Sequence, residues 1–244
     1  MAKKPEDIGA VAARHRSMSF FDHLDELRVR LIRALIAFVI VSCVFYSYID
    51  PLFHWIVRPV GQLVFTSPSE AFVARVLLAL WGGFFFSLPV TLFEIWQFVA
   101  SGLKEKERKY ILVFGPCSLV LFLLGGIFAY IVAVPMALKF LLSFSSDWMV
   151  PMITVKNYIS FIGTFMLGFG VVFELPLILM FLTKIGIATP EFLIQKRRHA
   201  IVLLLIISAV LTPPDVVSLL IMSVPLIVLY EVGIIVSKMT YRSK

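Results

Sequence analysis

The stretch GFGVVFELPLILMF, Gly168 to Phe181, places a single glutamate in an otherwise apolar run. The run reads as part of a membrane-spanning helix, and Glu174 lies near its centre. An ionised carboxylate in hydrocarbon costs about 2.5 kcal/mol or considerably more. We therefore expect the Glu174 side chain to face protein or water rather than lipid.

The composition of the whole chain agrees with this interpretation. Of its 244 residues, 60% are hydrophobic and only 15% are charged. A typical soluble domain carries about 25% charged residues. The sequence therefore predicts an all-α integral membrane protein, with one membrane domain covering residues 1–244.

Six apolar segments are expected to cross the membrane. A span needs about 20 apolar residues, which the first four segments provide. The fifth, AIVLLLIISAVL, is about 18 Å long at 1.5 Å per residue, and the sixth is interrupted by Glu231. We favour two short spans at the end of the chain over a tight hairpin. The predicted elements are an N-terminal interfacial helix at about 19–30 and spans at about 31–49, 76–100, 111–134, 159–183, 200–211 and 216–236.

The distribution of basic residues predicts the orientation. All but four of the 22 Lys and Arg residues fall in the N-terminal segment, the 101–110 and 184–199 loops or the C-terminal tail. Because Lys- and Arg-rich loops stay in the cytoplasm, both termini are predicted to be cytoplasmic. Topology then explains the net charge of +7, and nucleic-acid binding is not expected.

Motifs of common enzyme classes are missing from the sequence. It contains no G-x-x-x-x-G-K-[ST], H-E-x-x-H, G-x-S-x-G or C-x-x-C motif. Two isolated cysteines and four scattered histidines do not form a metal-ligand set. We expect no enzymatic activity, no cofactor and no metal ion, so the protein must draw on ion gradients or partners.

Two predicted cytoplasmic segments keep carboxylates although both are net basic. SFFDHLDELRVRL, residues 19–31, carries Glu26 opposite an apolar helix face, and FVASGLKEKERKY, residues 98–110, carries Glu107. One interpretation is a charged interfacial helix and an ordinary loop with paired charges. The other is that the two carboxylates bind a guanidinium group through bidentate, charge-assisted hydrogen bonds.

Glu94 and Glu174 are the two acids predicted to lie within the membrane. Proline and glycine residues surround both and permit close helix contacts. Glu174 is either a neutral, hydrogen-bonded packing residue or a protonatable or polar site in a groove. Near the other side of the membrane, TPPD at 212–215 predicts a rigid turn because prolines stop helices; Asp215 is also a candidate for an outer contact.

Taken together, five motifs in this order resemble the TatC family, the multispanning subunit of the twin-arginine translocase. They are HLDELRVRL, SPSEAF, F-x-x-x-GLKEKER, FGVVFELP and TPPD, and they extend from about His23 to Tyr230. The resemblance implies a concave, cupped arrangement of six helices. It also implies a receptor for twin-arginine signal peptides of folded precursors, driven by the protonmotive force with TatA- and TatB-type single-span partners. Self-association and a bacterial inner-membrane location are implied as well.

The resemblance also assigns roles to individual positions. Glu174 is implied to line an intramembrane polar groove. Glu94 stands where the family commonly has glutamine, which gives this chain a second intramembrane acid. The residues implied to bind the signal peptide are Glu26, Arg28, Phe98, Leu103, Glu107, Arg108 and Lys109, and those implied to act on the outer face or dock partners are Pro59, Thr212 and Asp215.

Two other functions are compatible with the residues themselves. One is a small proton-coupled secondary transporter in which Glu94 and Glu174 carry protons. It predicts a small substrate and little dependence on Glu26 or Glu107. The other is a purely structural membrane scaffold, in which all four acids are dispensable.

Overall fold

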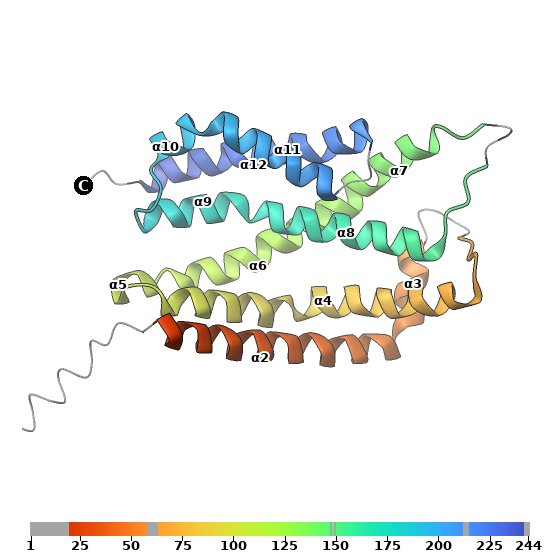
Figure 1. Ribbon diagram of the computed structural model, residues 1–244, viewed down its shortest axis with the longest axis horizontal. Helices are drawn as coiled ribbons and strands as arrows, with labels where there is room; N and C mark the ends of the chain where they lie inside the picture. The colour runs from red at the N-terminus through yellow and green to blue at the C-terminus, as the bar shows by residue number, and fades with distance from the viewer. Residues whose placement is uncertain (1–19, 58–62, 147, 149, 212–214, 242–244) are drawn as a thin grey trace, which may run out of the picture.

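The computed structural model describes residues 20–57, 63–146, 148, 150–211 and 215–241, and this part of the chain is almost entirely helical. Its long helices lie side by side along the long axis of the molecule, and a short helix runs across them at one end (Figure 1). The elements are α2 (Phe20–Ser47), α3 (Ile49–Val57), α4 (Pro68–Ser101), α5 (Glu105–Arg108), α6 (Ile111–Phe128), the π-helix η2 (Ala129–Ala133), α7 (Val134–Leu142), α8 (Val155–Phe173), α9 (Leu175–Lys184), α10 (Pro190–Gln195), α11 (Arg197–Leu211) and α12 (Val216–Thr240).

Within the described residues, five helical runs are long and apolar enough to cross a membrane: Phe21–Ser47, Pro68–Ser101, Ile111–Leu142, Val155–Lys184 and Val216–Thr240. The all-α membrane class predicted from composition is therefore confirmed. One end of the molecule holds the start of α2, the end of α12 and the whole of the short helices α5 and α10 (Figure 1). It is called the terminal end below. The opposite end, with α3 and the start of α4, is called the distal end.

Several helix boundaries differ from those predicted. The interfacial helix expected at 19–30 and the span expected from 31 form one uninterrupted helix, α2. Its charged first turns continue the helix because Leu, Glu and Arg are all strong helix formers. The second long helix begins at Pro68 rather than near residue 76, since proline is well suited to a first helical turn.

The expectation of a short last helix is wrong, because α12 has 25 residues and is therefore about 37 Å long. Glu231 does not interrupt it. Its carboxylate accepts a hydrogen bond from the Arg197 guanidinium at 2.7 Å, and both side chains are substantially exposed. By contrast, α11 has 15 residues and is about 22 Å long.

Two long helical runs change their winding next to a proline. Pro135 has no N–H to donate to the preceding turn, and the five residues of η2 lie just before it. Pro176 similarly follows the break between α8 and α9, where Glu174 has a turn conformation. The break places the Glu174 side chain between two helical segments instead of inside one straight helix.

The α8 helix forms the centre of the bundle, and α2 lies at its edge. Tyr158, Phe165 and Phe169 of α8 are each at most 2% exposed.

Close helix crossings depend on glycine, because small residues let backbones approach. A Cβ on Gly83 would lie 2.6 Å from the Ser42 Cα across the α2–α4 contact.

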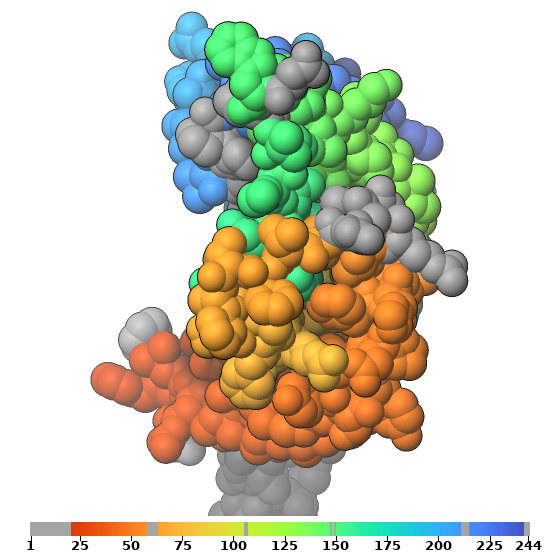
Figure 2. Space-filling model, turned by 90° about the vertical axis from the view of Figure 1, so that its right-hand side faces the viewer, coloured from red at the N-terminus to blue at the C-terminus, as the bar shows by residue number. Residues whose placement is uncertain are grey.

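At the distal end, which faces the viewer in Figure 2, two connecting segments pair through backbone hydrogen bonds. The Val64 N–H donates to the Ile153 carbonyl at 3.1 Å, and the Val155 N–H donates to the Val64 carbonyl at 3.0 Å. This pairing joins the segment before α4 to the segment before α8. It therefore fixes the starts of two long helices relative to each other.

Candidate functional site

Three charged side chains meet between α2 and α4 near the terminal end. Arg30 donates from Nε and one terminal nitrogen to Oε1 of Glu26, at 2.9 and 2.5 Å. Its other terminal nitrogen donates to Oε2 of Glu94 at 3.0 Å. Glu26 and Arg30 are one helical turn apart on α2, whereas Glu94 comes from α4. The guanidinium thus links the two helices, and Glu94, an intramembrane acid in the sequence analysis, is part of an ion-pair cluster.

A cavity of about 320 Å³ opens beside this cluster. Glu26 contributes to its wall, and its second carboxylate oxygen, Oε2, is buried and makes no hydrogen bond of good geometry among the described residues, with the Ser101 hydroxyl beside the carboxylate. An unsatisfied buried acceptor costs about 1–3 kcal/mol, and more when it is charged. Carboxylate, amide and hydroxyl groups in one wall suit a guanidinium donor. The lining residues are Glu26, Arg30, Gln97, Ala100, Ser101, Arg108, Ile111 and Leu112; this set is called the α2–α4 cavity below.

An aromatic contact fixes the wall of the α2–α4 cavity. The His23 ring stacks on Phe98, with 4.3 Å between ring centroids. The Ser101 hydroxyl donates to the Phe98 carbonyl at 2.7 Å and lies 3.3 Å from Nδ1 of His23. These contacts hold the start of α2 against the end of α4, which is where Glu26 projects.

Glu107 faces a different cavity from Glu26. Its carboxylate accepts a hydrogen bond from the Lys104 N–H at 3.2 Å, which closes the short turn of α5. Its neighbour Arg108 lines the α2–α4 cavity, so adjacent residues of α5 face two cavities. The second cavity, of about 480 Å³, is lined by Glu107, Thr183, Lys184, Ile185, Gly186, Thr189, Thr240 and Tyr241; it is called the α5–α9 cavity below.

The remaining predicted residues of the terminal end have varied environments. Leu103 packs against a small buried cluster that includes Trp96 and Phe114. Arg28 is exposed on α2. Lys109 is exposed too, and its ammonium group lies 5.6 Å from the centre of the Tyr110 ring.

Glu174 is a buried side chain, 8% exposed, and is separate from the charged cluster. The Ser118 hydroxyl of α6 donates to its Oε1 at 3.0 Å. This geometry directs the carboxylate toward protein, as its position in an apolar run predicts. Glu94, the other acid predicted to lie within the membrane, has an arginine for a partner, so the two acids have different chemical surroundings.

At the distal end, Asp215 caps the start of α12. Its Oδ1 accepts a hydrogen bond from the Ser218 N–H at 2.6 Å, which satisfies one of the free donors of the first turn. Pro59 and Thr212, two other residues predicted for this side, lie outside the described residues. The structure therefore places only Asp215 of the three.

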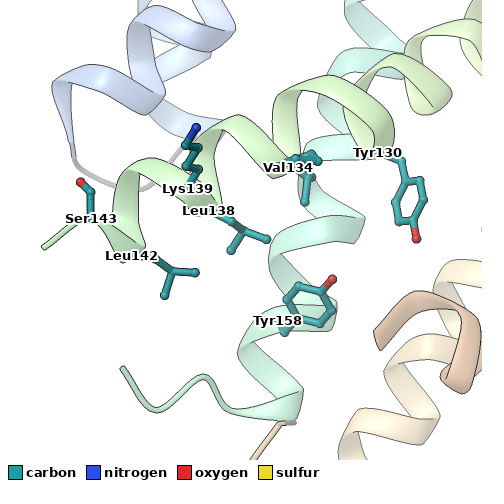
Figure 3. Close-up of a pocket in the computed structure, with 8 residues that line it drawn as sticks. Tyr130, Val134, Leu138, Lys139, Leu142, Ser143 and Tyr158 are labelled. Carbon is teal, nitrogen blue, oxygen red and sulfur yellow. The ribbon is translucent and has the colours of Figure 1, made fainter. Parts of the chain in front are cut away.

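A largely apolar cavity of about 560 Å³ lies between α7 and α8 (Figure 3). Leu138 and Leu142 of α7 and the Tyr158 ring of α8 contribute to its wall. The Tyr158 hydroxyl donates to the Ile56 carbonyl at 3.1 Å. None of these residues was predicted from the sequence to belong to a site.

Comparison with known proteins identifies the family. The family model for the Sec-independent protein translocase protein TatC matches residues 22–225. The chain belongs to the TatC family. It is 42% identical over 228 residues to a TatC protein of Carboxydothermus hydrogenoformans, covering 91% of this chain and 94% of that protein. It is 35% identical to the Aquifex aeolicus TatC protein, covering 93% and 98% of the two chains.

The structural comparison agrees with the sequence comparison. A crystal structure described as the twin-arginine translocase receptor TatC superposes with a TM-score of 0.81 at 36% identity. The match covers 90% of this chain and all of the other. The resemblance to the TatC family is thus confirmed. The family serves protein translocation and is not enzymatic, so the expectation of no enzymatic activity is confirmed too.

Two polar contacts were not predicted within this TatC chain. Glu70 of the SPSEAF motif is 8% exposed and accepts hydrogen bonds from the N–H and hydroxyl of Thr66, at 2.8 and 2.9 Å. The pattern S-x-x-E before an apolar run is a signal for a helix N-terminus, although Glu70 bonds to Thr66, one residue before the N-cap Ser67. Ser118 gave a weaker signal, because a lone serine in an apolar helix does not reveal its partner on another helix.

Proposed function

We propose that this protein is the receptor and core subunit of a twin-arginine translocase in a bacterial inner membrane. In this proposal it binds twin-arginine signal peptides at the terminal end and scaffolds TatA- and TatB-type partners. Folded precursors then cross with energy from the protonmotive force. The observation that carries the proposal is the half-satisfied Glu26 carboxylate in the α2–α4 cavity.

The two cavities on either side of α5 match the chemistry of two adjacent arginines. In an extended peptide, successive side chains point in opposite directions. One arginine then enters the α2–α4 cavity and bonds to Glu26, while the other reaches Glu107 in the α5–α9 cavity. Guanidinium groups suit such sites better than ammonium groups because their planar N–H pattern permits bidentate bonds to carboxylate.

The orientation and the number of spans are part of the proposal. The terminal end carries most of the basic loops, and the positive-inside rule assigns such loops to the cytoplasm. We place both termini there. We assign α11 as a sixth, short span, with the membrane thinned locally around its roughly 22 Å length.

Several other predicted roles belong to this proposal as well. Glu174, held by Ser118, lies on the path that the apolar part of the signal peptide takes beyond the cavities. Asp215 lies next to the proposed docking site for single-span partners, together with Pro59 and Thr212. The small-solute transporter is not retained, because the chain belongs to a protein translocase family and Glu94 is ion-paired with Arg30.

Photo-crosslinking tests the location of the binding site. Leu112 and Val113 are adjacent on α6 and 81% and 63% exposed, but only Leu112 lines the α2–α4 cavity. A photoreactive phenylalanine analogue at 112 is expected to capture a twin-arginine peptide, with competition by unlabelled peptide but not by its twin-lysine form. The same analogue at 113 is the control and should capture little. Equal capture from both positions would contradict the proposed site.

A further inference from the structure

The Arg30 guanidinium already occupies the type of site that a signal-peptide arginine needs. It makes two hydrogen bonds to Glu26 and one to Glu94. The side chains of Arg30, Glu26 and Glu94 are 18%, 17% and 11% exposed, so solvent screens these interactions only partly. Arg30 of the chain itself is therefore already bonded to Glu26, the carboxylate that is proposed to bind an arginine of the signal peptide.

The charge balance of the cluster explains how Glu26 can still accept a ligand. Two carboxylates share the single positive charge of Arg30. Arg33 approaches Glu94 at 3.9 Å, but its side chain is 62% exposed, so its contribution is small. Arg108 of the cavity wall is exposed as well. The buried groups of the cluster thus carry one more negative than positive charge, which favours one more guanidinium, and Glu26 Oε2 is the oxygen that makes no hydrogen bond of good geometry.

We propose that Arg30 is an internal competitor for the incoming arginine at Glu26, and that Glu94 sets the strength of this competition. Glu94 holds the far edge of the Arg30 guanidinium, so Arg30 keeps a charged partner when a ligand takes over part of Glu26. A neutral residue at position 94 leaves Arg30 to Glu26 alone and strengthens the competition. This inference rests on the proposed receptor function and adds affinity-determining roles for Arg30 and Glu94.

Peptide affinities of charge-neutralised variants test the inference. The full chain in detergent is titrated with a labelled twin-arginine peptide at fixed ionic strength, and binding is followed by fluorescence anisotropy. Arg30→Gln is expected to bind about tenfold more tightly and Glu94→Gln about tenfold more weakly, as for close charge pairs at interfaces. In the double variant Arg30→Gln/Glu94→Gln the affinity is expected to follow that of Arg30→Gln, because no competitor remains.

The exposed pair of Arg197 and Glu231 supplies matched controls. Arg197→Gln and Glu231→Gln change the charge by the same amounts, on helices away from the α2–α4 cavity (Figure 1). Both are expected to leave the affinity within twofold of the wild type. Thermal unfolding of every variant checks that it is folded, and the double variant removes Glu94, one of the two acids that lose their guanidinium partner in Arg30→Gln.

The outcomes separate this inference from the receptor function. Arginine-selective binding by the wild type, with no gain in Arg30→Gln or in the double variant, overturns the competitor and leaves the receptor. Binding that appears only when Arg30 is replaced supports both the receptor function and the competition by Arg30. It would mean that Arg30 outcompetes the peptide in the wild type. Absence of binding in the wild type, in Arg30→Gln and in the double variant overturns both.

Discussion

Replacing Gly125 by alanine is predicted to force α6 away from α8. A Cβ at this position would lie 2.5 Å from the Phe169 carbonyl oxygen and 2.9 Å from the Gly170 Cα. Favourable contacts between such atoms need about 3.5 Å, so the two backbones must separate by about 1 Å. Overpacking of this kind costs about 1–3 kcal/mol.

The next residue provides a closely matched control. A Cβ on Gly126 would lie 3.6 Å from its nearest neighbour, a Phe85 ring atom, which is an ordinary contact. Both Gly→Ala changes gain the same helix propensity, about 1 kcal/mol. The difference between the variants is therefore the overpacking cost alone, about 1–3 kcal/mol.

Thermal unfolding of the purified variants in detergent, followed by tryptophan fluorescence, measures this difference. A difference of 1 kcal/mol corresponds to about 2–4 °C in Tm for a chain of this size. Gly125→Ala is expected to melt several degrees below Gly126→Ala, and Gly126→Ala at or above the wild type. Equal Tm values for the two variants would refute the close backbone crossing of α6 and α8.

Three further substitutions test single contacts. Ser118→Ala removes the donor to the buried Glu174 carboxylate and is expected to cost about 1–2 kcal/mol of unfolding free energy, measured as a lower Tm; an unchanged Tm would mean that this hydrogen bond is not formed. Arg197→Ala breaks the exposed pair with Glu231 and is expected to cost less than about 1 kcal/mol, with any effect decreasing at high salt; a larger, salt-independent loss would be inconsistent with an exposed pair. Glu70→Ala removes the acceptor for the turn before α4 and is expected to speed limited proteolysis between residues 58 and 68; an unaltered cleavage pattern would argue against its role.

The fold could be predicted largely from hydropathy, because apolar segments of sufficient length have few stable states other than membrane helices. The predicted helix boundaries that were wrong lie at charged residues near the ends of apolar segments. Glu231 looked like an interruption, but a partner on another helix lets α12 continue through it. The charged turn around Glu26 looked like a separate interfacial helix, yet its i,i+4 pair with Arg30 supports a continuous α2.

The candidate site was predicted less completely. Glu26 and Glu107 stood out because they are acids in segments that the topology requires to be basic. The separation of their cavities was not predictable, since it depends on how the four residues of α5 lie between α4 and α6. The pairing of Arg30 with Glu94 joins residues 64 positions apart, and nothing in the local sequence specifies such a contact.

The most direct test of the receptor function is the affinity of the purified protein for a twin-arginine signal peptide and for its twin-lysine form. The wild type is expected to bind the arginine form more tightly, and Glu26→Ala and Glu107→Ala are each expected to lose this preference. Glu231→Ala, an equal charge change at an exposed pair, should retain it. Binding that ignores both the arginine-to-lysine change and the two cavity glutamates would contradict the receptor function.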